Sequence, residues 1–507
     1  DFSDPKLAWW RRCLLRWWRV IGIVFGLPDT APAETMHAAV FEAPLLENSP
    51  TLEEMLPPPL LQHILQSLEA GELGRAACVS RSLREAAEAD HLWRPHAAQR
   101  FLVGVGAAEA DVEAGGGARG PDGAATASWR SAFCAWALAF RGYAPADVTA
   151  ALRAWRAVER WTEAHFPEVR RSLRAGATEE ALSAAATELG LPEGVFPAAL
   201  RLLHRVHEGQ ALLLDQVRSE GAHQLTPQER ASIFHGLFGG YTFYEHLVNV
   251  RLLPLEKVVA TTSMCREAGL LAPRSSAVVF AASFNFSKLF LVDAATGAVE
   301  VVGKNRKRLP AAPAGPDALL RWFGTFADRL AEGYYEPACM DPSGDPSTRA
   351  ISLFPRRGPD LSVAVTRGVQ VAASALFVPE QSTPGKEFFT YSVRFSMVSR
   401  EEQLERWREA GPPRALASAQ LRSRHWLISN RRGQVDEVRG EAVVGMYPIV
   451  RPGHPDFVYQ SCTGLSSAPG SMRGEFCFVE GTIAEPAGAD FDAECAAFAL
   501  RVPEYVY

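Results

Sequence analysis

The sequence predicts a multidomain α+β protein with a small helical segment, a mixed α+β region and a C-terminal all-β sandwich. In the helical segment, apolar residues recur at helical spacing: Leu60, Leu61, Ile64, Leu65 and Leu68. After Tyr241 the apolar residues gather in short runs that are typical of strands. Between Phe389 and Met397 apolar and polar residues alternate strictly, as they do along a half-buried strand.

The first 49 residues are predicted to be an N-terminal extension that is disordered or not native to the protein. Residues 1–26 are rich in Trp and Arg, a composition compatible with a helix on a membrane surface or a weak signal segment. The apolar run at 20–27 is too short to span a bilayer. Met36 shortly precedes the globular part, which favours an upstream extension of a gene model.

Residues 50–102 are predicted to form three short helices. Pro59 suits the first turn of a helix, Gly71 is expected to end that helix, and Ser82 with Glu85 has the spacing of a capping box. A segment of about 50 residues is marginal for a self-sufficient core. Either another protein or the rest of the chain must therefore cover its surplus apolar surface.

Changes in composition divide the remaining chain. Residues 103–128 are rich in Gly and Ala and are predicted to be a flexible linker. The pattern at 129–333 is first helical and then strand-like, which indicates an α+β domain. Residues 334–361 are rich in Pro and Asp and are predicted to be a second linker. Short strands with turn signals indicate a β-sandwich at 362–507, interrupted by a mobile or helical loop at 399–420.

Charge and cysteine usage argue against several classes of site. The formal net charge is −6 and the chain has no long basic stretch, so we expect no nucleic-acid partner. The eight cysteines are scattered without a C-x-x-C pair or a nearby histidine at metal-ligand spacing. We therefore expect reduced thiols, no metal, no cofactor, no membrane partner, and a cytoplasmic or nuclear location.

The helical segment resembles an F-box domain. The resemblance rests on Leu56-Pro57, Leu60-Leu61, Ile64-Leu65, Leu68, Cys78–Arg81, Leu83-Arg84 and Leu92-Trp93. F-box domains bind the adaptor Skp1 and so join a cullin–RING ubiquitin ligase. By position, the resemblance implies these Skp1-facing residues: Leu56, Pro57, Leu60, Ile64, Leu65, Val79 and Trp93.

Two further regions resemble known families. The C-terminal region resembles the ApaG domain, a fibronectin-like sandwich, through Gly368–Val371, Arg424–Ile428, Val438–Gly445, Tyr447-Pro448, Phe457–Cys462 and Gly470–Phe476. The middle region resembles the Smi1/Knr4 (SUKH) family through Gly176–Glu180, Leu191-Pro192, Val206–Gln210, Gly236–Tyr241 and Leu252–Leu255. The order of the three modules is similar to that of plant Skp1-interacting F-box/ApaG proteins and their animal F-box-only counterparts.

One glycine-containing loop, residues 440–445, is a candidate anion-binding site. Bacterial ApaG proteins carry a glycine-rich loop suggested to bind pyrophosphate, and Gly440 and Gly445 lie at its first and last glycine positions. The middle glycine is replaced by Ala442, and the valines that follow it favour a strand over the helix that a phosphate loop normally opens. A turn into a strand is therefore favoured over an anion-binding loop. Nowhere does the sequence place a nucleophile, base and oxyanion donor together.

The sequence thus predicts a protein that is not itself an enzyme but the substrate-recognition subunit of a Skp1–cullin–F-box ubiquitin ligase. The F-box would dock on Skp1, and the SUKH-like and ApaG domains would recruit an unknown protein substrate. Two alternatives remain open. The protein could instead bind pyrophosphate or a nucleotide through the ApaG loop, or it could be a Skp1-bound scaffold without a ligase role.

Overall fold

The computed structural model describes residues 57–104, 118–191, 196–211, 226–341, 344–383, 385–407 and 415–507. The predicted N-terminal extension lies outside the described residues, as do Leu56 and the central part, 105–117, of the first predicted linker. The chain divides into two compact units, Asp1–Trp93 and Arg94–Tyr507.

Short helices build the described part of the first unit. They are α4 (Pro58–Gln66), α5 (Ala70–Ala76), α6 (Arg81–Ala87) and the beginning of α7 (Asp90–Phe101). As predicted, Pro59 lies in the first turn of α4. Two details differ from prediction. Gly71 lies inside α5, whose start is fixed by the reciprocal capping of Glu69 and Glu72, and the cap of α6 is Ser80, whose Oγ accepts the Leu83 amide at 3.0 Å. Side-chain capping by Glu69 and Glu72 at the start of α5 offsets the low helix propensity of Gly71.

The second unit begins with a helical layer: α9 (Trp129–Ala139), α10 (Pro145–His165), α11 (Pro167–Ser172), α12 (Glu179–Glu188), α13 (Ala198–Val206) and α15 (Pro227–Ser232). Just before α9, the structure differs from the flexible linker predicted at 103–128. Residues 118–128 form a turn closed by a bridge between Arg119 and Ala125. The Trp136 indole donates to the Arg119 carbonyl at 2.8 Å, so this turn is fixed to α9.

An eight-stranded sheet follows, in the order β6-β5-β4-β3-β2-β1-β8-β7. Its strands are β1 (Gly240–Phe243), β2 (His246–Leu252), β3 (Ala277–Ser283), β4 (Lys288–Asp293), β5 (Val299–Gly303), β6 (Arg308–Pro310), β7 (Glu336–Cys339) and β8 (Arg349–Ser352). Helix α16 (Leu255–Glu267) contacts β3, and α17 (Ala318–Ala331) contacts α10. Trp322 of α17 packs against Phe238, Phe280 and Phe290, which places the core between this helix and the sheet.

The predicted linker at 334–361 is therefore not a linker in the structure. Strands β7 and β8 pair antiparallel within it, and β8 joins them to β1. The Pro- and Asp-rich composition has a local cause, because Asp345 caps a short 3-10 helix, Pro346–Thr348, between these two strands. The pairing brings together residues distant in sequence, which local composition does not reveal.

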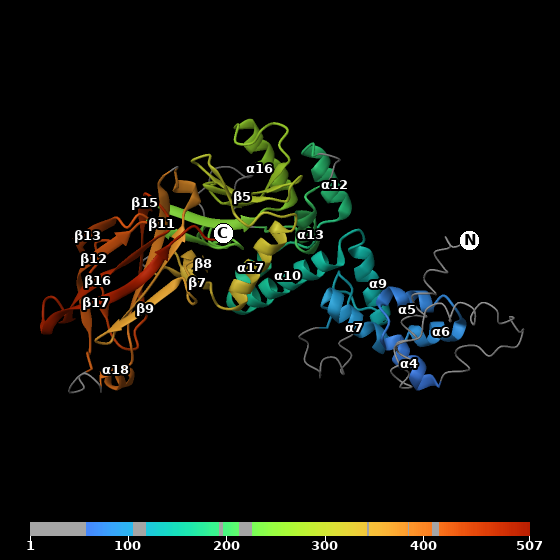
Figure 1. Ribbon diagram of the computed structural model, residues 1–507, viewed down its shortest axis with the longest axis horizontal. Coiled ribbons are helices and arrows are strands. Elements are labelled where there is room, and N and C mark those ends of the chain that lie inside the picture. The colour runs from blue at the N-terminus through green and yellow to red at the C-terminus, as the bar shows by residue number, and fades with distance from the viewer. Residues whose placement is uncertain are drawn as a thin grey trace, which may run out of the picture. The chain divides into compact units, whose positions relative to one another are not determined.

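Two facing sheets form the C-terminal part (Figure 1). One has the order β15-β11-β10-β9 and the other β13-β12-β16-β17, with β14 paired to β12. Their strands are β9 (Leu361–Thr366), β10 (Val369–Phe377), β11 (Glu387–Met397), β12 (Ala419–Ser429), β13 (Val435–Glu441), β14 (Ile449–Val450), β15 (Phe457–Leu465), β16 (Gly470–Gly481) and β17 (Pro486–Leu500). Helix α18 (Arg400–Trp407) occupies the predicted insertion. Phe395 and Phe476 meet between the sheets with ring centroids 4.6 Å apart, so the predicted sandwich is present.

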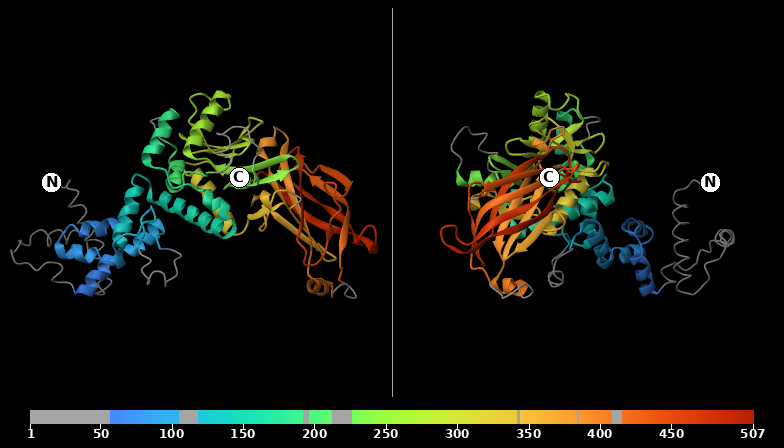
Figure 2. Two further views of the ribbon diagram at one scale, coloured as in Figure 1. Left: turned by 180° about the vertical axis from the view of Figure 1, so that it is seen from behind. Right: turned by 60° about the vertical axis from the view of Figure 1, so that its left-hand side comes forward.

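The C-terminal residues leave the sandwich and enter the core beside α17, where the C label lies in Figure 2. The Tyr507 ring packs on Trp322 with centroids 4.9 Å apart, and its hydroxyl donates to the Trp322 carbonyl at 2.9 Å. The Trp322 indole in turn donates to the Val506 carbonyl at 2.7 Å. This tail ties the sandwich to the α+β part of the same unit.

A buried charged cluster makes a second connection. Lys288 on β4 is fully buried beside Tyr241, and Glu380, in a short 3-10 helix before β11, accepts the Tyr241 hydroxyl at 2.7 Å. His246 Nε2 also lies 2.8 Å from Glu380. Burial lowers the pKa of Lys288 to about 8. Burial alone would raise the pKa of Glu380, but the charge of Lys288 and the hydrogen bonds from His246 and Tyr241 bring it below its ordinary value.

Candidate functional site

The residues with a predicted docking role divide into exposed and buried groups. Pro57 is exposed, Leu60 is half-buried, and Val79, in the turn between α5 and α6, keeps 50% of its surface accessible. Ile64, Leu65 and Trp93 are instead buried. Leu56 lies outside the described residues.

Trp93 is buried within the helical unit, and its predicted role in docking stays a prediction. Its indole N–H donates to the Ala87 carbonyl at 2.7 Å, so its polar atom is already satisfied within the helical unit. Ile64 and Leu65 lie inward on α4, with Leu73 of α5 also buried. Ile64, Leu65 and Leu73 therefore pack within the helical unit, and of the described residues with a predicted docking role Pro57, Leu60 and Val79 stay wholly or partly accessible. Helical spacing could not make this distinction, because both adjacent stripes of α4 are apolar.

The predicted anion-binding loop has an ordinary turn geometry. Strand β13 ends at Glu441, and the amides of Ala442 and Val443 donate to the carbonyls of Arg422 and Met446. The Arg424 guanidinium donates to the carbonyls of Glu441 and Ala442. A strand, β14, rather than a helix comes next. Gly440 and Gly445 thus flank a turn in which these amides are already used, and the helix N-terminus that would favour an anion is missing.

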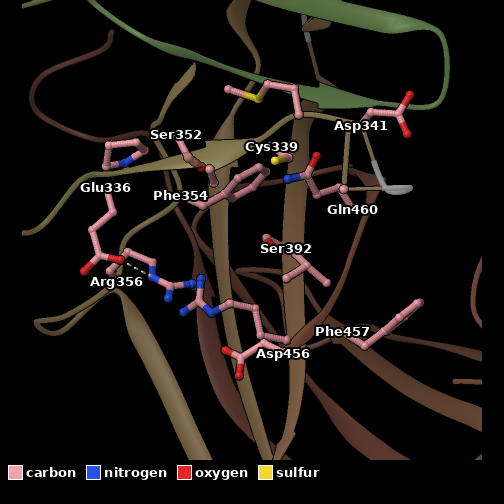
Figure 3. A pocket seen from close by; sticks show the side chains of 16 residues that line it. Glu336, Cys339, Asp341, Ser352, Phe354, Arg356, Ser392, Asp456, Phe457 and Gln460 are labelled. Carbon is pink, nitrogen blue, oxygen red and sulfur yellow. Dashed lines mark hydrogen bonds and ion pairs between the residues drawn. The ribbon is translucent and has the colours of Figure 1, made fainter. Parts of the chain in front are cut away.

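A pocket of about 470 Å³ lies between the eight-stranded sheet and the sandwich (Figure 3). One wall is formed by β7, Asp341, Gly344, Ser352, Phe354 and Arg356, and the other by residues of β11 and of β15 with the preceding Asp456. Sequence reasoning missed this site. Its two walls come from segments that the sequence assigns to a linker and to a separate domain, so no local motif marks it.

The two arginines of the pocket, Arg356 and Arg394, differ in whether they form an ion pair. Arg356 Nε lies 3.0 Å from Glu336 Oε2, a pair visible in Figure 3. Arg394 on β11 keeps only 6% of its surface accessible, yet forms no hydrogen bond or ion pair through its side chain with any residue that the structure describes. Burial and the neighbouring positive charge of Arg356 lower the pKa of Arg394 to about 10. The charges of Asp456 and Glu336 act in the opposite direction, and the guanidinium remains cationic at neutral pH without an ion pair to a described residue.

The described part of the chain gives little support for a metal site, a membrane-spanning helix or a reactive Cys462 thiol. Within it, no group of three or more His, Cys, Asp or Glu side chains is placed to hold a metal ion. No helix among the described residues is both long and apolar enough to cross a membrane. Burial raises the pKa of the Cys462 thiol, which makes it a poor nucleophile at neutral pH.

Comparison with known proteins identifies two domains. Residues 54–97 match the F-box-like family, and residues 379–480 match the ApaG domain. Over 28% of the chain, "Protein ApaG" of Anaeromyxobacter dehalogenans is 40% identical, across 97% of its own length. The predicted F-box and ApaG domains are thereby confirmed, whereas the Smi1/Knr4 resemblance of residues 129–333 stays a prediction.

The likeness extends along most of the chain. "F-box protein SKIP16" of Arabidopsis thaliana is 31% identical over 88% of this chain and 98% of its own length. "F-box only protein 3" of Mus musculus is 28% identical over 84% of this chain and 77% of its own length. The chain therefore belongs to the family of F-box proteins that carry a C-terminal ApaG domain.

Proposed function

We propose that this protein is the substrate-recognition subunit of a Skp1–cullin–F-box ubiquitin ligase. The observation that carries the proposal is the F-box-like match at residues 54–97, within a likeness to F-box proteins that spans most of the chain. In this role the helical unit docks on Skp1. Ubiquitin transfer belongs to the associated subunits, to which this protein brings the substrate by proximity.

The exposed part of the helical unit supports the docking role. Pro57, Leu60 and Val79 present apolar surface that the described chain leaves wholly or partly accessible. Burying one such side chain in an interface contributes roughly 1.5–3 kcal/mol before the costs of association. A few contacts of this size are enough for a specific complex when the helices are already formed.

The second unit supports the role of a receptor. The C-terminal tail and the buried Lys288–Glu380 cluster both join the sandwich to the α+β part. Two domains held together in this way present one continuous surface, instead of two independently moving ones. Substrate bound to that surface is then held in a defined position within the unit.

Substitution at Val79 tests Skp1 docking. Val79→Asp places a charge on an exposed apolar side chain without opening a core cavity, so the helical unit is expected to stay folded. Co-expression of the full chain with Skp1, followed by pull-down, is expected to recover at least about tenfold less Skp1 with this variant.

Leu138→Asp is the matched control. Leu138 on α9 keeps 70% of its surface accessible but lies outside the F-box-like match, so this variant is expected to recover Skp1 as the wild type does. Circular dichroism verifies that both variants retain their helices. Equal recovery of Skp1 by Val79→Asp and wild type, or no recovery by either, contradicts the docking proposal.

A further inference from the structure

We propose that the pocket between β7–β8 and β11–β15 binds an extended acidic peptide segment, whose anionic group is received by Arg394. This inference deepens the proposed function, because it names the chemical class of the substrate segment. Only one part of the inference rests on the proposed function, namely that the bound peptide belongs to a substrate of the ubiquitin ligase.

The register of the sheet places the polar side chains of one wall together. Ser392 pairs with Gln460, and Arg394 pairs with Val458, in the antiparallel ladder of β11 and β15. Side chains at alternate positions share a face, so Ser392, Arg394 and Gln460 point away from the sandwich core. Tyr391 and Phe395, at the alternate positions on either side of these two β11 residues, pack inward between the sheets. The pocket is therefore built on the outer face of this sheet.

Arg394 supplies a cationic group that forms no hydrogen bond or ion pair with the described residues, although the charges of Glu336 and Asp456 act on it. Burying a charge is costly unless another charge or hydrogen bonds compensate it. Arg356 is engaged by Glu336, whereas Arg394 has no such contact among the described residues. A guanidinium receives carboxylate or phosphate oxygens through two parallel hydrogen bonds. The group that compensates Arg394 is thus expected to come from a ligand.

Gln460 indicates that the ligand also carries hydrogen-bond donors. Its side-chain Oε1 is buried without a hydrogen-bond partner in the structure. A free carboxylate supplies no donor for this atom, but a peptide backbone supplies N–H groups. Strands β7 and β15 are each at the edge of their sheet, and edge strands recognise extended peptides through main-chain hydrogen bonds. A peptide with an acidic side chain satisfies both Gln460 and Arg394.

Competing acidic side chains limit the choice of ligand. Glu336, Asp341 and Asp456 also line the pocket. Glu336 is held by Arg356, and Asp456 is exposed and forms no ion pair with Arg394. The charge of Asp456 nevertheless acts on Arg394 and opposes an incoming anion. The volume of about 470 Å³ admits one acidic side chain with part of its backbone.

Retention of degenerate peptide pools tests the inference. Three pools of seven-residue peptides carry a fixed central glutamate, phosphoserine or glutamine, with random flanking positions. Each pool is passed over the immobilised full chain without Skp1. We expect the wild type to retain the glutamate pool, the phosphoserine pool or both at least about tenfold more than the glutamine pool. Which acidic pool is retained distinguishes a carboxylate ligand from a phosphorylated one.

Variants separate recognition from folding. Arg394→Gln is expected to reduce retention of the acidic pools to the level of the glutamine pool, and Asp456→Asn to maintain or increase it. Because Arg394 forms no hydrogen bond or ion pair with the described residues, Arg394→Gln is also expected to leave the melting temperature unchanged or raise it, whereas loss of a structural arginine would lower it. Val79→Asp is expected to retain the acidic pools fully, which keeps this test independent of Skp1 docking.

Several outcomes overturn the inference. Equal retention of the three pools, or of none, shows that the pocket does not select an acidic peptide. Retention of the acidic pools by Arg394→Gln at the wild-type level removes Arg394 from recognition. A lower melting temperature of both Arg394→Gln and Asp456→Asn shows that these two side chains form an internal pair, so that no ligand is needed to compensate Arg394.

Discussion

At the scale of single residues, one buried charged cluster connects the two parts of the second unit, because Lys288 and Glu380 both contact the Tyr241 hydroxyl. Glu380 and Lys288 are almost fully enclosed, and Tyr241 and His246 share the same carboxylate. Removing one member of a buried pair leaves the other charge uncompensated, which typically costs about 3–5 kcal/mol. Glu380→Gln is therefore expected to lower the unfolding free energy of the second unit by about this amount.

Chemical denaturation followed by tryptophan fluorescence measures this loss. The double variant Glu380→Gln/Lys288→Met is the matched control, because it removes both charges and is expected to recover part of the stability. A single variant as stable as the wild type shows that Glu380 is not the compensating charge of Lys288.

The same carboxylate predicts how stability depends on pH. The pKa of Glu380 is lower in the folded chain than its ordinary value of 4.5. The folded state therefore binds fewer protons than the unfolded state in acid, and the stabilisation from Glu380 is present above pH 4.5 and decreases as pH falls through the lowered pKa. We expect Glu380→Gln to show a weaker loss of stability below pH 4.5 than the wild type in melting experiments. Parallel curves for the two proteins would contradict this origin of the acid sensitivity.

At the scale of elements, the C-terminal tail connects the sandwich to helix α17 through its contacts with Trp322. The buried ring of Tyr507 packs on Trp322 and Phe326, so Tyr507→Ala is expected to cost about 3–5 kcal/mol, as large-to-small changes in aromatic cores do. Tyr505→Ala changes a half-buried ring in the same tail and is expected to cost less. Thermal unfolding and limited proteolysis compare the two. Equal effects would indicate that the tail does not depend on the Tyr507 contact.

The elements also show which features were predictable. The helices of the F-box follow from leucine spacing within a few residues, although Ser80 rather than Ser82 provides the cap. The alternation from Phe389 to Met397 correctly predicts β11, although both faces of this strand are largely buried: the apolar face lies inside the sandwich, and Ser392 and Arg394 on the other face line the pocket. Strands β7 and β8 were missed because Pro337 and the Asp- and Pro-rich turn between them carry a linker composition. Their pairing is decided by tertiary contacts.

At the scale of the whole molecule, the order of modules predicted from sequence agrees with the F-box and ApaG matches. The candidate site was less predictable. Trp93 matches a position of the F-box pattern, but the structure buries its ring inside the unit, where its indole donates to the Ala87 carbonyl. The pocket around Arg394 depends on the pairing of β11 with β15 and on the strands of the supposed linker. Neither the pairing of β11 with β15 nor the position of β7 and β8 beside them joins residues that are neighbours in sequence.

The most direct test of the central claim is the ubiquitin state of proteins bound by this chain. Wild type and Val79→Asp are expressed with the proteasome blocked and purified, and ubiquitin-modified sites are quantified on each co-purified protein. We expect a set of proteins that bind both forms but carry increased ubiquitin only with the wild type, because only that form also engages Skp1. The same ubiquitin modification of bound proteins with both forms would contradict a role as a ligase substrate receptor.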